Sequence, residues 1–315
     1  MIAFVLRRLV WSLAAIVLVV SATFAMVVAI PADPARALVG AHADAETLGR
    51  ARAHYCLDRS LPEQYGCYVG RLAHGDLGES YRTRRPVADI LWARAWPTVQ
   101  LALAALVLQL AIGLPLGAWS AVRRGRWPDR VGGVITLVGA SVPTFVLGTL
   151  AVYVLAFGAG WFPVAGYGEG LAGRLHHLLL PALTLACAGI ATYVRVARAE
   201  LIEQLAADHV RTARAKGVAE MSVVFRHAGR NAVAPLVAVA GVDLGVLFGG
   251  AVVTETVFAW PGLGRETLLA VLDLDLPLIL GVTLLAAVAV VIVNLVADLV
   301  VTRLDPRTDP RFDGS

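Results

Sequence analysis

Lysine, methionine and cysteine are scarce in this 315-residue chain, which has one lysine, three methionines and three cysteines. Because the single lysine, Lys216, is followed by Gly217 and Val218, the chain has no Gly-Lys-Ser/Thr phosphate-binding loop. It also has no His-Glu-x-x-His metalloprotease helix and no Gly-x-Ser-x-Gly nucleophile elbow. The sequence therefore predicts a non-catalytic protein with no cofactor of its own. If ATP powers it, another subunit must bind the ATP.

Charged residues are also few, at 16%, while 58% of the residues are hydrophobic and the mean hydropathy is +0.73. This share of hydrophobic residues is far larger than a soluble domain needs. About 20 helical residues cross the hydrocarbon core of a bilayer, where backbone groups must bond within the chain. We therefore predict an all-α integral membrane protein with about six spans. Five apolar windows without charged residues cover 9–30, 95–122, 131–168, 175–194 and 276–297. A sixth apolar window, from 232 to 258, contains Asp243 and Glu255.

Arginine is concentrated in four segments: before the first span, at 123–130, at 198–230 and after 303. Short loops rich in Arg and Lys stay in the cytoplasm. Both termini are therefore predicted to be cytoplasmic, and the net charge of +4 reflects this sidedness, not nucleic-acid binding. The chain divides into a stub with the first span (1–30), an outward, periplasmic segment (31–94), a five-helix core (95–303) and a cytoplasmic tail (304–315).

A polar, basic stretch of the core, 198–231, separates two apolar runs and predicts a cytoplasmic helix–turn–helix. Asp208 can cap a short helix, and Lys216 suits that helix's negative end. Gly217 supplies the left-handed residue that stops it. A second helix runs from about Glu220 into the membrane. Such a hairpin is a lever on which another protein could push.

The apolar window at 232–258 carries two further features. Gly241, Gly245 and Gly249 recur at four-residue spacing, which permits close helix packing, either within the chain or against a second permease. Asp243 is costly in lipid and predicts either a lining residue of a translocation path or a carboxyl bonded to a neighbouring helix.

Cysteine and histidine give weaker signals. Cys56 and Cys67 lie in the outward segment, where an oxidising compartment allows a disulfide, although two unpaired thiols fit equally well. Their spacing matches no usual zinc site. His176 and His177 are adjacent on a helix and point about 100° apart, so interfacial anchoring is favoured over a metal site. Trp260 is predicted to lie at the membrane interface.

The chain resembles the dipeptide/oligopeptide/nickel permease family of bacterial ABC importers in the order and spacing of several sequence motifs. The hairpin resembles that family's coupling loop, and Gly217 and Pro235 match its pattern. Where the broad loop signature has Glu-Ala-Ala, this chain has Arg211, Thr212 and Ala213. The other matching segments are Phe4-Val-Leu-Arg-Arg-Leu9, Gly75-Asp-Leu-Gly-Glu-Ser80, Leu178-Leu-Leu-Pro-Ala-Leu183, Glu255-Thr-Val-Phe-Ala-Trp-Pro-Gly-Leu-Gly264 and Leu304-Asp-Pro-Arg307.

The resemblance implies a type I ABC importer permease fold in the bacterial inner membrane. It implies four kinds of neighbour: a second homologous permease, two ABC ATPase subunits that bind ATP and Mg²⁺, an external solute-binding protein, and lipid. The coupling residues that it implies are Asp208, Ala213, Ala215, Gly217, Val218, Met221, Val224 and Phe225.

The implied cargo is a dipeptide or oligopeptide, since the pattern looks closest to the peptide branch. Relatives with the same skeleton carry nickel or a nickel chelate, glutathione or small glycans. A secondary transporter would need no ATPase and would often show inverted repeats, which we do not find. A channel would need a selectivity motif, which is missing.

Overall fold

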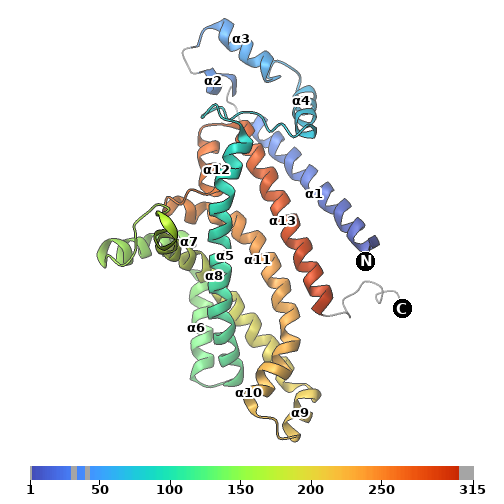
Figure 1. Ribbon diagram of the computed structural model, residues 1–315, viewed down its shortest axis with the longest axis vertical. Helices are drawn as coiled ribbons and strands as arrows, with labels where there is room; N and C mark the ends of the chain where they lie inside the picture. The colour runs from blue at the N-terminus through green and yellow to red at the C-terminus, as the bar shows by residue number, and fades with distance from the viewer. Residues whose placement is uncertain (1, 30–33, 40–42, 305–315) are drawn as a thin grey trace. The chain divides into compact units, whose positions relative to one another are not determined.

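The computed structural model describes residues 2–29, 34–39 and 43–304, and every regular element in these ranges is a helix (Figure 1). One isolated bridge joins Glu79 and Pro86. The chain forms two compact units: one contains residues 1–98 and 261–291, and the other contains residues 99–260 and 292–315. The division falls inside two long helices, α5 (Val87–Val122) and α13 (Leu276–Leu304).

The first unit combines the N-terminal helices with the beginnings of α5 and α13. At the start of α4, the Ser60 N–H donates to the Glu63 carboxylate, as in a capping box, and the Ser60 hydroxyl donates to the same carboxylate. One apolar cluster packs Phe24 of α1 against Tyr68 of α4 and Leu280 of α13. The other helices of this unit are α1 (Ile2–Val28), α2 (Pro34–Val39), α3 (Ala45–His54), α4 (Leu61–Ala73) and α12 (Leu263–Leu272).

The second unit is built around α8 (Gly170–Ala206), which packs against α6, α7 and α11. Its apolar core includes Leu101, Ile190 and Leu247, all buried. The remaining elements are α6 (Trp127–Ser141), α7 (Thr144–Ala151), the π-helix η1 (Val152–Gly158), α9 (Asp208–Ala215), α10 (Glu220–Ser222), the π-helix η2 (Val223–Ala228) and α11 (Gly229–Val257).

Glycines set how closely α5 and α6 approach α8. A Cβ at Gly113 would lie 2.6 Å from the Cβ of Tyr193, and one at Gly117 would lie 2.8 Å from the Val194 carbonyl oxygen. On α6, a Cβ at Gly139 would lie 2.8 Å from that of Ala191. Real Cβ atoms do not approach this closely, so the backbones meet only because these positions have no side chain.

Apolar helices of membrane-spanning length confirm the predicted fold class. Four qualify among the described residues: Val87–Val122, Gly170–Ala206, Glu220–Gly249 and Leu276–Val300. A fifth is counted if the bent pair of α6 with α7 and η1 is one span, and α1 contributes a shorter apolar stretch, Val10–Met26.

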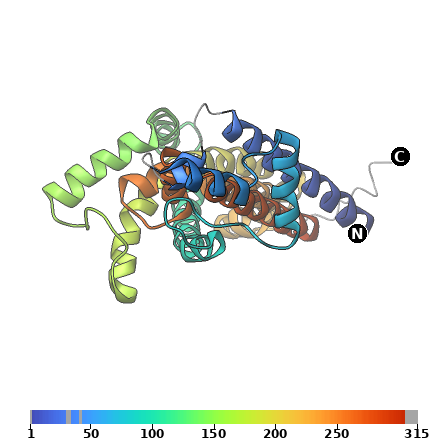
Figure 2. The same ribbon diagram turned by 90° about the horizontal axis from the view of Figure 1, so that it is seen from above.

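The predicted third window, 131–168, is not one straight helix. Its two parts, Trp127–Gly139 and Thr144–Gly158, meet at 98°, and Figure 2 shows α7 lying across the direction of α6. The cause is Pro143. A proline pushes the preceding residue out of the helical region, and Val142 is extended, with φ −92° and ψ 121°. The sequence contained this signal, which a hydropathy window does not register.

Candidate functional site

The predicted basic hairpin is present between α8 and α11 (Figure 1). The α9 helix ends at Ala215, and Gly217 follows with φ +74°, in the left-handed region that favours glycine. The Gly217 N–H donates to the Arg214 carbonyl, and the Val218 N–H donates to that of Ala213. The chain then enters α10, η2 and α11 without a break, as predicted from Glu220 onward.

The predicted cap of α9 is wrong. Ala207 occupies the N-cap position and makes no side-chain cap bond, while Asp208 is the first helical residue. The Asp208 carboxylate instead accepts from Arg211, at 3.2 Å. An acidic side chain in the first turn still stabilises the helix through its dipole, so the residue type fits even though the bond differs.

Small and branched apolar side chains fix the hairpin to the helix bundle. Val210 and Ala213 of α9 pack with Val223 and Ala228 of η2. The same cluster includes Ala121 of α5, Leu201 of α8 and Ala232 of α11. The hairpin is therefore one packed piece with the ends of three long helices, which is what a lever requires.

The apolar residues assigned by resemblance to a coupling surface differ in their exposure. Met221 and Phe225 are 72% and 63% exposed, and Ala215 is also exposed. Val218 is half-buried, whereas Ala213 and Val224 are buried. We therefore define the Met221–Phe225 surface as the exposed side chains of Ala215, Met221 and Phe225.

One ion pair closes the hairpin. Arg214 donates twice to Glu220, at 2.6 and 3.1 Å, and once to the Leu205 carbonyl at 3.4 Å. Because the Arg214 guanidinium donates hydrogen bonds to the Glu220 carboxylate, the pKa of Arg214 is raised above its ordinary value. Both side chains are about half exposed, so the pair orients the turn and contributes little stability.

A second ion pair, which the sequence did not predict, joins α8 to the first turn of α6. Arg198 donates to both carboxylate oxygens of Asp129, at 2.5 and 3.0 Å, and the Gly125 N–H donates to Asp129 at 2.9 Å. Asp129 is the one acidic residue among the arginines at 123–130, a contrast that could have marked it. The pair ties α8 to α6 eight residues before α8 ends at Ala206.

Inside the second unit, Asp243 of α11 lies beside Tyr193 of α8, whose hydroxyl donates to its carboxylate at 3.3 Å. This matches the alternative of a carboxyl bonded to a neighbouring helix, and a place in a translocation path stays a prediction. The three glycines at four-residue spacing on α11 differ in their surroundings. A Cβ at Gly241 would lie 2.2 Å from the Cβ of Ala297 on α13, while Gly249 faces open space. Gly245 is partly buried.

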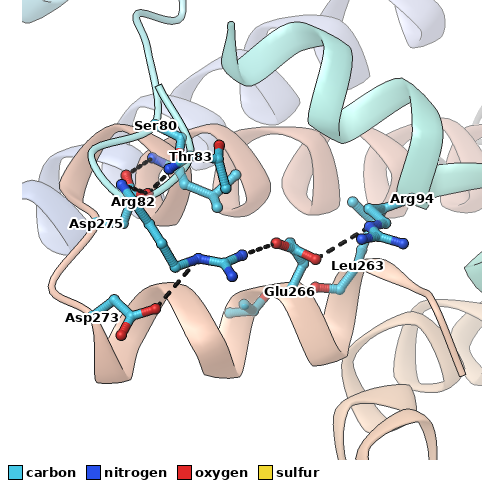
Figure 3. Close-up of polar contacts among 10 residues, drawn as sticks. Ser80, Arg82, Thr83, Arg94, Leu263, Glu266, Asp273 and Asp275 are labelled. Atoms are coloured by element: carbon cyan, nitrogen blue, oxygen red, sulfur yellow. Dashed lines mark hydrogen bonds and ion pairs between the residues drawn. The ribbon is translucent and has the colours of Figure 1, made fainter. Parts of the chain in front are cut away.

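The first unit contains a polar network that we call the Glu266 network (Figure 3). It consists of Ser80, Arg82, Arg94, Glu266, Asp273 and Asp275. The fully buried Asp275 precedes α13 and accepts from the Ser80 hydroxyl at 2.5 Å, the Arg82 N–H at 3.2 Å and the Leu278 N–H at 3.3 Å. The last bond caps α13.

Glu266, 6% exposed on α12, is held between two arginines from the segment before and within α5. Arg82 pairs with one of its oxygens and Arg94 with the other, at 3.2 Å, while Arg82 also reaches Asp273 at 3.3 Å (Figure 3). A buried carboxylate is stable only when it is paired in this way. The network fastens the end of the predicted outward segment to α12 and α13.

The structure joins Cys56 and Cys67 in a disulfide between the end of α3 and α4. His176 bonds the Trp161 carbonyl at 2.9 Å and His177 bonds that of Gly173 at 2.9 Å. Over the described ranges, no three His, Cys, Asp or Glu side chains are grouped as a metal site.

The interfacial assignment of Trp260 is wrong. The side chain is fully buried, with its ring 4.8 Å from that of Tyr167. Ala259 before it takes a positive φ of 49°, and this turns the chain back so that the Trp260 N–H reaches the Glu255 carbonyl. Hydropathy at the end of a window does not distinguish an interfacial tryptophan from one folded into the core.

Comparison with protein families gives two matches that together span most of the chain. Residues 113–310 match the binding-protein-dependent transport system inner membrane component family. Residues 1–102 match the N-terminal region of a binding-protein-dependent transport system membrane component.

Similar curated proteins match over nearly their whole length. The glutathione transport system permease protein GsiC of Escherichia coli O6:H1 is 39% identical over 306 residues, covering 97% of this chain and 98% of that protein. GsiC of Salmonella choleraesuis is 37% identical over the same shares, and GsiC of Escherichia coli K12 is 38% identical.

Among solved structures, a chain of the inward-facing MetNI methionine ABC transporter is similar with a TM-score of 0.55 and 19% identity. The match covers 69% of this chain and 96% of that one. At this identity the likeness establishes the fold alone.

Proposed function

The chain belongs to the binding-protein-dependent transport system inner membrane component family and is a multi-pass inner-membrane permease subunit of a bacterial ABC importer, and we propose that it imports short peptides, with glutathione first among them. One observation carries the cargo assignment: the glutathione permeases match over 97% of this chain at 37–39% identity. Glutathione is itself a tripeptide, so this cargo lies within the peptide class that the motifs predicted. Nickel chelates are the second candidate.

The proposed complex contains four other subunits. A second permease completes the translocation pathway, two ATPases bind ATP and Mg²⁺ on the cytoplasmic side, and an external solute-binding protein delivers the cargo. The exposed apolar side chains of the Met221–Phe225 surface support contact with an ATPase, since large exposed apolar groups mark interaction sites.

Movement of the ATPases would reach the membrane through the hairpin. Its packed core, with Val210, Ala213 and Val223, joins it to the ends of α5, α8 and α11. A displacement of the Met221–Phe225 surface would therefore displace those helices and switch the pathway between its two faces. Asp243 is retained as a candidate pathway residue.

Cargo is tested by reconstituting the complete complex in liposomes with ATP inside and the receptor outside. Uptake of labelled glutathione, a dipeptide and a nickel chelate is then compared. We expect ATP-dependent uptake of glutathione or the dipeptide. Uptake of the nickel chelate alone would refute the peptide assignment, and equal uptake without the ATPases would refute the importer mechanism.

Coupling is tested at Gly217. A β-branched residue resists positive φ, at a cost of roughly 1–2 kcal/mol, whereas asparagine tolerates it. Because a Cβ at Gly217 meets nothing within 4 Å, the strain arises from the backbone alone. We expect Gly217→Val to lower transport per ATP hydrolysed by about tenfold or more and Gly217→Asn to retain it. Equal coupling in both variants would exclude a role for the hairpin angle.

The single lysine allows a test of sidedness. Lys216 lies in the exposed turn of the hairpin, which we propose to be cytoplasmic together with both termini. A membrane-impermeant amine reagent should leave Lys216 unlabelled in intact spheroplasts and label it after permeabilisation, with mass spectrometry separating it from the N-terminal amine. Labelling of Lys216 in intact spheroplasts would contradict the proposed orientation.

A further inference from the structure

The second unit contains an apolar cavity of about 720 Å³ beside the hairpin. Its walls come from α5, the end of α8, the hairpin and the start of α11. This volume is within the roughly 300–1,000 Å³ range of small-ligand sites. The apolar side chains that form most of the wall are Leu114, Pro115, Trp119, Leu201, Val233 and Leu236.

Two arginines line the same cavity. Arg123 lies directly after α5 and Arg230 is the second residue of α11, and both are exposed. Neither is in an ion pair with a carboxylate among the residues that the structure describes. Glu220 also lines the cavity, but its two oxygens are held by Arg214 at 2.6 and 3.1 Å. The cavity therefore offers uncompensated positive charge beside apolar surface.

Aromatic side chains of the kind that is enriched at the level of lipid headgroups lie beside this part of the cavity. The ring of Trp119 lies 4.7 Å from that of Trp127, and the Arg123 guanidinium lies 5.9 Å from the Trp119 ring centre. Tryptophan prefers the membrane–water interface, and basic pockets between membrane helices bind anionic headgroups.

We propose that the cavity binds one anionic phospholipid of the surrounding bilayer. Its phosphate pairs with Arg123 and Arg230, and an acyl chain fills the apolar cavity between α5 and α11. An apolar helix of a partner protein would cover the apolar wall but leave both guanidinium groups unpaired. A zwitterionic lipid would bring its own cation next to them. Met221 and Phe225 also line the cavity, so the phospholipid would lie next to the Met221–Phe225 surface and its occupancy would bear on coupling.

The test uses the complete complex, extracted with its lipids and analysed by native mass spectrometry after exchange into nanodiscs of phosphatidylglycerol or phosphatidylcholine. We expect wild-type complex to retain one phosphatidylglycerol per copy of this chain. The double variant Arg123→Gln/Arg230→Gln should retain at least tenfold less. The double variant Arg124→Gln/Arg126→Gln removes the same number of charges next to the cavity and is the matched control, since neither Arg124 nor Arg126 lines it. Retention by this control should equal that of the wild type.

A second variant separates tail from headgroup binding. Ala118→Phe fills the cavity while keeping both arginines, and we expect it to release the phospholipid as well. Three results would overturn the proposal: equal retention in the double variant, equal retention of phosphatidylcholine, or lipid bound to the isolated subunit but absent from the assembled complex. The last result would assign the cavity to a partner protein.

Discussion

The hairpin and the Glu266 network place their charges in opposite environments. Asp275 and Glu266 are buried, and every carboxylate oxygen of the two has a partner, whereas the Arg214–Glu220 pair of the hairpin is about half exposed. The hairpin depends instead on a small apolar core around Val210. Buried charges fix a conformation, while exposed ones stay available to a partner. The contrast predicts which region fails when its charges are removed.

The largest loss of stability is expected for Asp275→Ala. It leaves the Ser80 hydroxyl and the Arg82 and Leu278 N–H groups without their acceptor, at a cost of about 3 kcal/mol. Thermal unfolding of the detergent-purified chain measures it. Asp273→Ala is the control, since Asp273 is 45% exposed and makes one ion pair. Equal losses in the two variants would remove the distinction between buried and exposed carboxylates.

Glu266→Gln should follow, with a cost of about 2 kcal/mol. The change keeps the shape but removes the charge that Arg82 and Arg94 share. These arginines are 33% and 39% exposed, so water partly replaces the lost partner. The same unfolding assay should therefore place this variant between Asp275→Ala and the Asp273→Ala control; a loss larger than that of Asp275→Ala would contradict the ranking.

Asp129→Asn should cost about 1 kcal/mol, because the Arg198 pair is bidentate but partly open to solvent. Here the more informative measurement is transport per ATP hydrolysed, which we expect to fall because α8 loses its tie to the first turn of α6. Arg198→Lys, which keeps the charge but not the two-point bond, should show the same defect in weaker form. Unchanged coupling in both would make the pair purely structural.

The smallest effect is expected for Arg214→Ala, under about 1 kcal/mol, because its partner is exposed. Wild-type stability should also change little between low and high salt. A loss similar to that of Glu266→Gln would show that the hairpin depends on its charges after all.

The sequence was sufficient for features that depend on local composition. Runs of apolar residues predicted the spans, and Gly217 predicted the end of α9. It was insufficient where distant segments meet: Ser80 and Asp275 are 195 residues apart, and no local pattern pairs them. Nor could it tell which apolar residues of a hairpin face inward, so Ala213 and Val224 were assigned to a surface although they are buried.

The missing side chains at Gly113, Gly117 and Gly139 limit how α8 can move. Backbones in direct contact leave no space for one helix to slide or rotate against another without a clash. We therefore expect α5, α6 and α8 to turn as a single rigid block during each cycle, with flexing confined to the joints outside it. The kink at Pro143 is the nearest such joint along the chain.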